Sequence, residues 1–190
     1  MDYLDTILRR YTHLPALLHM VQHSCLTFLS PETWDDRQDA FFIQQYQSVQ
    51  EIRTVLAVCL SEAPETYHHW YTFAHGPSGV SIAFKRERLL TALNANPDIR
   101  HGRVEYVKIN DLGKHVHGAS QMPFLKRFPF SPECEYRLLY ERQLEEVTVF
   151  EQKISLDCID RIYLSPWMPN SVATSVKTFL KASSLFKDLR

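Results

Sequence analysis

The chain has 190 residues, the size of one domain and enough to bury a sizeable core. Hydrophobic residues make up 45% and charged residues 23%, which is typical of a soluble globular protein. The formal net charge of −1 excludes an overall electrostatic attraction to nucleic acid or to an anionic membrane, although a local basic patch is compatible with it.

The four cysteines form no CxxC pair, and one lies inside the apolar run VLAVCLS. We therefore expect buried, reduced thiols, although counting alone leaves a paired set open. The N-terminal stretch MDYLDTILRRYTHL has an acidic start and no long apolar run, unlike a signal peptide. No segment approaches the ~20 apolar residues of a membrane span. A cytoplasmic location is the resulting expectation.

The first half of the chain predicts alternating helices and strands. Residues 12–24 predict a helix that begins near Thr12, with leucines recurring at helical spacing. Two further helices, at residues 40–50 and 61–74, follow from their patterns. The predicted strands are residues 25–29, the nearly continuous apolar run 53–61, and the alternating run 79–85. Residues 30–40, SPETWDDRQDA, form a polar loop.

The second half predicts strands that follow one another closely. A helix at residues 86–95 precedes a strand at 102–109, and residues 122–128 predict a helical turn. Three strands and a closing helix then follow, at residues 133–141, 146–157, 158–166 and 170–184. This order predicts an α+β fold: a single domain over residues 1–190 with a mixed, mostly antiparallel sheet and flanking helices.

Common catalytic and nucleotide-binding motifs are absent. The chain has no GxxxxGK[ST], GxGxxG, HExxH or GxSxG, and only five glycines. His115 and His117 would share one face of a strand, with His101 not far away, so zinc is conceivable. No cysteine or acid lies at ligand spacing, and we predict no metal site.

The stretch FPFSPECEYRLLYE, residues 128–141, carries the strongest polar pattern. Read as a strand, it places Glu133, Glu135 and Arg137 on one face, and Tyr136 and Leu138 on the other. Two interpretations stay open: a solvated face, or the wall of a functional cleft. In either case we expect the Tyr136 face to pack into the core.

Several pieces of the chain, in order, resemble the bacterial domain-of-unknown-function 2971 family. They are LRRYTHLPALLHMVQHSCLTFLSPETWDDRQDAF, VLAVCLSEAPETYHHWYTFAHGPSGVSIAFKRERL, VEYV, FLKRFPFSPECEYRLLYE and ISLDCIDRIYLSP. That family has a Tyr-bearing start, here at Tyr11, an FNDPFE loop, a block with Trp and Tyr, and an E.E.R strand. The family, and the similar abortive-infection families, imply a link to phage defence or mobile elements.

The resemblance assigns positions residue by residue. The loop positions are Trp34, Asp35, Asp36 and Asp39, with Arg37 in place of the family's proline. Trp70 takes the tryptophan position, and Phe73 stands where the family has tyrosine, so that hydroxyl is lost. Glu133, Glu135 and Arg137 match E.E.R, and Phe130 lies near the usual upstream tryptophan.

This set is also similar to the ADP-ribosyltransferase arrangement, in which an early strand carries Arg or His and a late strand begins with a catalytic Glu. The ECE stretch resembles the Glu-x-Glu of its arginine-modifying branch, while the middle Ser-Thr-Ser element is not evident. The resemblance implies NAD as ligand, with Glu133, Glu135 and Arg137 as catalytic residues. The ligand-binding positions that we predict are Arg10, Tyr11, Trp34, Asp36 and Trp70.

Each predicted residue suits this chemistry. Trp34 and Trp70 could stack on a flat ring, Arg10 and Arg137 could grip a phosphate, and Glu135 could stabilise a developing cation. The partners would be a nucleotide-like molecule and a protein or nucleic-acid target. We also expect Asp36 or Asp39 of the polar loop to bond to an arginine or to backbone amides.

The alternative is a binding or regulatory module without catalysis. Glu135 and Arg137 would then form an ion pair on a wet face, worth about 0–1 kcal/mol. Trp34 and Trp70 would be core or interface anchors, and Asp36 would cap a turn.

Overall fold

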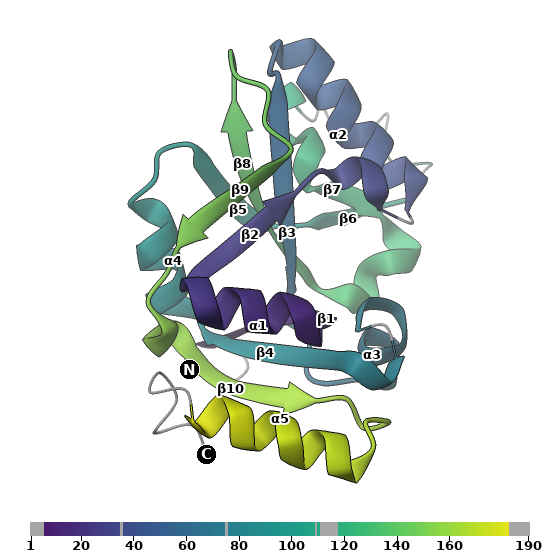
Figure 1. Cartoon of the computed structure of the whole chain (residues 1–190). Coiled ribbons are helices and arrows are strands. Elements are labelled where there is room, and N and C mark those ends of the chain that lie inside the picture. Colours follow the sequence, from purple (N-terminus) through teal and green to yellow (C-terminus); the bar gives the residue numbers. More distant parts are fainter. Residues whose placement is uncertain (1–5, 35, 75, 109, 111–117, 183–190) are drawn as a thin grey trace. The chain divides into compact units, whose positions relative to one another are not determined.

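The computed structural model describes residues 6–34, 36–74, 76–108, 110 and 118–182 (Figure 1). Its residues group into two compact units, each assembled from separated stretches of the chain. Unit 1 comprises residues 1–26, 62–93 and 153–190, and unit 2 comprises residues 27–61 and 94–152. The single domain expected over residues 1–190 stays a prediction.

The fold is α+β, as expected, with a large and mostly antiparallel sheet and flanking helices. Parallel pairing occurs in a separate two-stranded sheet. No helix in the described stretches is long and apolar enough to cross a membrane. His115 and His117 lie outside the described residues.

In unit 1, three antiparallel strands run in the order β10 (Ile159–Leu164), β4 (Gly79–Lys85), β1 (Ile7–His13). Its helices and 3-10 helices are α1 (Leu14–His23), α3 (Tyr67–Phe73), Gly76–Ser78, α4 (Arg86–Asn94, whose last residue falls in unit 2), Leu156–Cys158 and α5 (Asn170–Ala182).

Two helix starts in unit 1 differ from the sequence-based expectation. Helix α1 is capped by His13, whose Nδ1 accepts the Ala16 N–H at 3.1 Å, so the cap lies one residue after Thr12. Helix α3 is shorter than the predicted helix at 61–74, because Thr66 accepts the His69 N–H and caps it. Ser61, expected near that start, instead ends strand β3 in unit 2.

Unit 2 is built on three long strands that pair antiparallel. β3 (Thr54–Ser61) pairs with β8 (Glu135–Arg142), and β8 pairs on its other side with β5 (Ile99–Arg103). β2 (Cys25–Leu29), which begins in unit 1, pairs with β3 through Leu29 and Ala57. The parallel pair is β6 (Glu105–Val107) with β7 (Leu125–Arg127), and β9 (Val149–Lys153) ends at the unit boundary.

Helix α2 (Arg37–Gln50) covers one face of β3 and β8 (Figure 1). The core beneath it consists of Ile43, Tyr46, Val55, Ala57 and Leu139. The helix also packs on the 3-10 helix Ala119–Phe124. The remaining 3-10 helices of unit 2 are Pro31–Thr33 and Phe128–Glu133.

Several predicted elements of unit 2 have different bounds. The helix predicted at 40–50 begins at Arg37, inside the predicted polar loop, and the strand predicted at 146–157 is confined to β9. The strand expected at 133–141 begins only at Glu135, because Phe128–Glu133 forms a 3-10 helix and Cys134 has a left-handed φ of 44°. The strand expected at 102–109 is divided between β5 and β6. The helical turn expected at 122–128 is split into a 3-10 helix and strand β7.

Candidate functional site: a buried charge cluster in unit 2

Arg137 lies at the centre of a cluster of charged side chains, and all five of its N–H donors are used. Nε and Nη2 donate to the two carboxylate oxygens of Glu135, at 2.7 and 2.9 Å. Nη1 and Nη2 donate to the two oxygens of Asp39, at 2.9 and 2.6 Å. The second Nη1 proton is donated to the Pro123 carbonyl oxygen at 2.7 Å. This guanidinium is therefore held by two bidentate pairs.

Lys126 of strand β7 adds a second cation to the same carboxylates. Its Nζ lies 2.6 Å from Glu133, 3.4 Å from Glu135 and 3.6 Å from Asp39. We call Asp39, Lys126, Glu133, Glu135 and Arg137 the charge cluster. All five residues are buried, and Arg137 is completely so.

The solvated-face interpretation of this strand is therefore wrong. Glu135 and Arg137 are buried by helix α2 and its neighbours, although β8 is a strand with both side chains on one face. Tyr136 and Leu138 are buried on the other face, as expected. The small energy of an exposed ion pair does not apply to Glu135 and Arg137, because both ions have lost their water.

The loop before α2 brings Asp39 to Arg137, which confirms the expected approach of this loop to the strand. Asp36 is the N-cap of α2 and accepts the N–H groups of Gln38 and Asp39 at 3.0 and 3.2 Å. The cap fixes the first helical turn, so that the Asp39 side chain in that turn faces Arg137. Asp36 therefore supports the site as a helix cap. Among the described residues, it forms no ion pair with Lys126 or Arg137.

Trp34 lies over the cluster from the same loop. The Arg137 Cζ is 4.9 Å from the centre of its indole ring, a cation–π contact. The ring is half-buried and also packs against the core under α2. Trp34 therefore covers Arg137 while part of the ring meets solvent.

The cluster carries an excess of negative charge. Three carboxyl groups surround two cations, and burial disfavours ionised carboxylates. Burial raises the pKa of Glu133 above its usual value, although Lys126 opposes this. Burial likewise raises the pKa of Asp39, against the opposing charge of Arg137. An additional positive charge, or a proton, would be stabilised at this site.

Glu135 behaves differently from its neighbours. Burial opposes its ionisation, but the charge and hydrogen bonds of Arg137, with help from Lys126, outweigh burial and lower its pKa to about 2. Its backbone N–H also donates to the Tyr106 hydroxyl at 2.8 Å. Glu135 is therefore ionised throughout the physiological pH range.

Cys59 is the exposed residue beside this cluster. It pairs with Arg137 across β3 and β8 and is exposed, while Val58 and Leu60 on either side are buried. Although the residue is exposed, burial of its thiol group by neighbouring atoms raises the pKa of that thiol well above the usual value, and the adjacent Glu135 carboxylate adds to that shift. Solvent thus reaches the cluster's face of the sheet at Cys59.

The thiols follow the sequence-based expectation only in part. Cys25 and Cys158 are buried, as expected, whereas Cys59 and Cys134 are exposed.

The remaining predicted site residues belong to unit 1. Arg10 and Tyr11 are half-buried residues of β1. Trp70 is buried, its Nε1 donates to Glu65 at 2.7 Å, and Tyr11 meets its ring edge-on at 5.5 Å. The Tyr11 ring also stacks on His69 at 5.2 Å. Trp70 thus packs against Tyr11 in an aromatic cluster of unit 1.

Sequence reasoning missed Lys126 and Cys59. Lys126 lies in the FLKRF piece, for which the sequence predicted a helical turn. It reaches the carboxylates because Leu125–Arg127 is a strand. Cys59 read as one more residue of an apolar strand. Neither residue had a sequence signal of its own, because Lys126 stands beside a second cation, Arg127, and Cys59 stands inside an apolar run.

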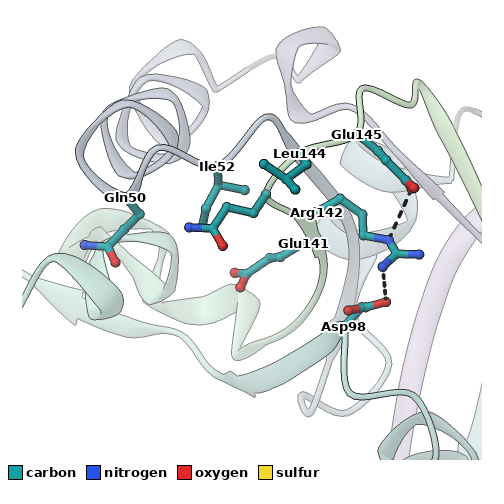
Figure 2. A pocket seen from close by; sticks show the side chains of 8 residues that line it. Gln50, Ile52, Asp98, Glu141, Arg142, Leu144 and Glu145 are labelled. Atoms are coloured by element: carbon teal, nitrogen blue, oxygen red, sulfur yellow. Dashed lines mark ion pairs between the residues drawn. The ribbon is translucent and has the colours of Figure 1, made fainter.

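A pocket of about 480 Å³ lies at the far end of strand β8 (Figure 2). Within it, Arg142 pairs with Asp98 at 3.1 Å and with Glu145 at 3.6 Å. None of the predicted site residues lines it. Its lining is Gln50, Ile52, Asp98, Glu141, Arg142, Gln143, Leu144 and Glu145.

Comparison with known proteins adds no relative. No protein-family model matches the chain, and no curated protein matches it. The resemblances to the domain-of-unknown-function 2971 family and to the ADP-ribosyltransferase arrangement stay expectations.

Proposed function

We propose that this protein is a nucleotide-binding enzyme, an ADP-ribosyltransferase-like transferase or an NAD glycohydrolase, that uses the charge cluster of unit 2. The observation that carries the proposal is the excess of carboxylates over cations in a rigid, buried network. Such a site favours a ligand that carries positive charge or develops it during reaction. The nicotinamide ring of NAD carries such a charge, and the ribose develops one when nicotinamide leaves.

The cluster's burial supports a functional role over a purely structural one. Taking five ions out of water is costly, and a buried ion network is often no more stable than apolar residues of similar volume. Stability alone is thus a weak reason for this arrangement. Networks of this kind do hold side chains in fixed geometry, which electrostatic catalysis requires.

Four residues have distinct roles in this proposal. Glu135, with a pKa lowered to about 2, stays ionised and stabilises the charge that develops on the ribose. Glu133, with a raised pKa, accepts a proton from the attacking group. Trp34 offers the half-buried ring for stacking, and the exposed position of Cys59 marks the approach.

The bond changes balance without a further reagent. The bond between the ribose C1′ and the nicotinamide nitrogen breaks, and its electron pair leaves with nicotinamide. The attacking atom is the oxygen of water, or an oxygen or nitrogen of a protein or nucleic acid. It bonds to C1′ and loses its proton to Glu133. A role in phage defence or mobile-element conflict rests on the sequence resemblance alone.

The second candidate is a binding or regulatory module without turnover. It is favoured by Arg137, because all five of its donors are used within the protein and it is fully buried. In this alternative, Arg137 organises the loop that carries Trp34. A ligand would bind, and no bond in it would break.

The test is to incubate the purified protein with NAD and to quantify released nicotinamide by chromatography. A parallel thermal-shift series with NAD, ATP and nicotinamide mononucleotide measures binding; ligand at 100 times its Kd should add roughly 2.7 kcal/mol of stability. Binding with nicotinamide release supports the enzyme. Binding without release supports the binding module. If there is neither binding nor release, both candidates are overturned.

Variants connect any turnover to the cluster. Glu135→Gln and Glu133→Gln keep the shape of each side chain and remove its charge, so release should fall on the order of 10²-fold or more while NAD still binds. The matched control is Glu141→Gln. Glu141 lies on the same strand and bonds to Tyr46 and Arg100, but it is not part of the charge cluster. A loss of turnover in Glu141→Gln equal to that in Glu135→Gln would contradict these roles.

A further inference from the structure

Two cations of unit 2 lie over aromatic rings outside the charge cluster. Lys108 follows strand β6, and its Nζ is 5.1 Å from the centre of the Phe128 ring. Arg127 ends strand β7, and its Cζ is 5.2 Å from the centre of the Phe130 ring. Both rings belong to the 3-10 helix that follows β7. We call Lys108, Arg127, Phe128 and Phe130 the cation–aromatic strip.

The parallel pairing of β6 and β7 produces this strip. Val107 is opposite Arg127, so Lys108 comes level with Phe128 one residue further along. The strip combines two chain segments that are about 20 residues apart in the sequence. Its cations and rings therefore alternate over one small area.

The strip is open to solvent at Lys108 and Phe128. Lys108 is exposed, and Phe128 is 47% exposed. Arg127 and Phe130 are half-buried. A large apolar ring held in water beside a cation has the form of a stacking platform.

Arg127 carries an unsatisfied donor. Its Nε is buried, and it has no hydrogen-bond partner among the residues that the structure describes. A buried N–H without an acceptor costs about 1–3 kcal/mol. A phosphate oxygen is the acceptor that guanidinium groups bind best.

The cations of the strip differ from those of the charge cluster. Lys126 lies against Phe130 as well, but its ammonium group is held by Glu133, Glu135 and Asp39. Lys108 and Arg127 form no ion pair within the described stretches. The strip is thus locally basic although the whole chain has a net charge of −1.

We propose that the cation–aromatic strip binds single-stranded nucleic acid. Lys108 and Arg127 contact phosphates, and an unpaired base stacks on the exposed Phe128 ring. Single strands are favoured over duplexes because a base presents its face only when it is unstacked. An acidic peptide would satisfy the cations but would leave the ring without a flat partner. This inference does not depend on the proposed reaction with NAD.

Fluorescence anisotropy with a labelled single-stranded DNA or RNA of about 16 nucleotides tests the proposal, at salt concentrations from about 50 to 200 mM. We expect binding that weakens with salt. Lys108→Gln and Arg127→Gln should each reduce the slope of log K against log [salt] by about 0.7. Phe128→Ala should weaken binding roughly tenfold without changing that slope.

The control is Lys177→Gln, which removes an exposed lysine from α5 of unit 1. It matches the charge change of Lys108→Gln and should leave binding unchanged. Circular dichroism of every variant establishes that it is folded.

Three results would overturn the proposal. They are no binding of single strands at low salt, equal affinity for duplex and single strand, and equal losses in Lys177→Gln and Lys108→Gln. Nicotinamide release by the same preparations is measured separately, so this inference and the proposed reaction fail or succeed independently.

Discussion

Arg137 and Asp39 form a bidentate ion pair between strand β8 and the first turn of helix α2, with N–O distances of 2.9 and 2.6 Å. The two residues are 98 positions apart in the sequence, and both are buried. This pair fixes the start of α2 to the sheet, and it brings the loop that carries Trp34 over the guanidinium.

Replacement of Arg137 by alanine should destabilise the protein by about 3–5 kcal/mol, because Asp39 and Glu135 would be left buried without their counter-ion. Arg137→Lys should also destabilise, since an ammonium group cannot make two bidentate pairs. Urea unfolding measures both effects. The control is Arg88→Ala, which removes the exposed pair with Asp157 and should cost about 0–1 kcal/mol. A similar loss in the two alanine variants would contradict the importance of the buried cluster.

Glu135 should stabilise the fold most at neutral pH. Its pKa in the folded state is about 2, below the reference value of 4.5, so its contribution is complete above about pH 4.5 and is lost as the pH falls toward 2. The difference corresponds to a free energy on the order of 3 kcal/mol. The stabilities of wild type and Glu135→Gln should therefore differ greatly at pH 6, and the difference should shrink steadily as the pH falls from about 4.5 toward 2. A difference independent of pH would refute the ionised state of Glu135.

Glu133 should show the opposite pH dependence. Burial raises its pKa in the folded state, so its contribution to stability is present below the unfolded pKa and is lost as the pH rises through the folded one. The free energy of unfolding of wild type relative to Glu133→Gln should consequently fall as the pH rises above about 4. Denaturant titrations at several pH values measure it, and an increase over this range would reverse the assignment.

Asp36→Ala should destabilise helix α2 by about 0.5–2 kcal/mol, because the N–H groups of Gln38 and Asp39 lose their acceptor. Asp36→Ser retains an acceptor and should recover most of the loss. Thermal unfolding provides the comparison. If the two variants were equally unstable, the carboxylate would act in some way other than as a cap.

Gly79→Ala should destabilise unit 1. A Cβ on Gly79 would collide with the backbone carbonyl oxygen of Ala74 and lie 2.8 Å from its Cβ, so the turn before β4 would have to shift. The expected cost is about 1–3 kcal/mol. Gly118→Ala is the control, because its nearest neighbour would be the Ser120 Oγ at 3.8 Å. Equal melting temperatures for the two variants would exclude this close approach.

The sequence by itself determined the type and order of most elements. The apolar run at 53–61 and the alternation at 79–85 are strands as predicted, because pattern and burial agree there. The expected bonding of Asp36 or Asp39 to an arginine or to backbone amides is confirmed, whereas the helix that Asp36 caps begins at Arg37, inside the stretch predicted as a loop.

Only the tertiary structure decided the environment of Glu135 and Arg137. The alternation in ECEYRLLYE is the same for a wet face and for a buried one, and the choice depends on whether α2 covers that face. The sequence could not show that Asp39, Lys126 and Glu133 would meet Arg137, because their contacts join segments far apart in the chain. Once these charges are buried together, each one's protonation depends on the others, and that coupling exists only in the folded protein.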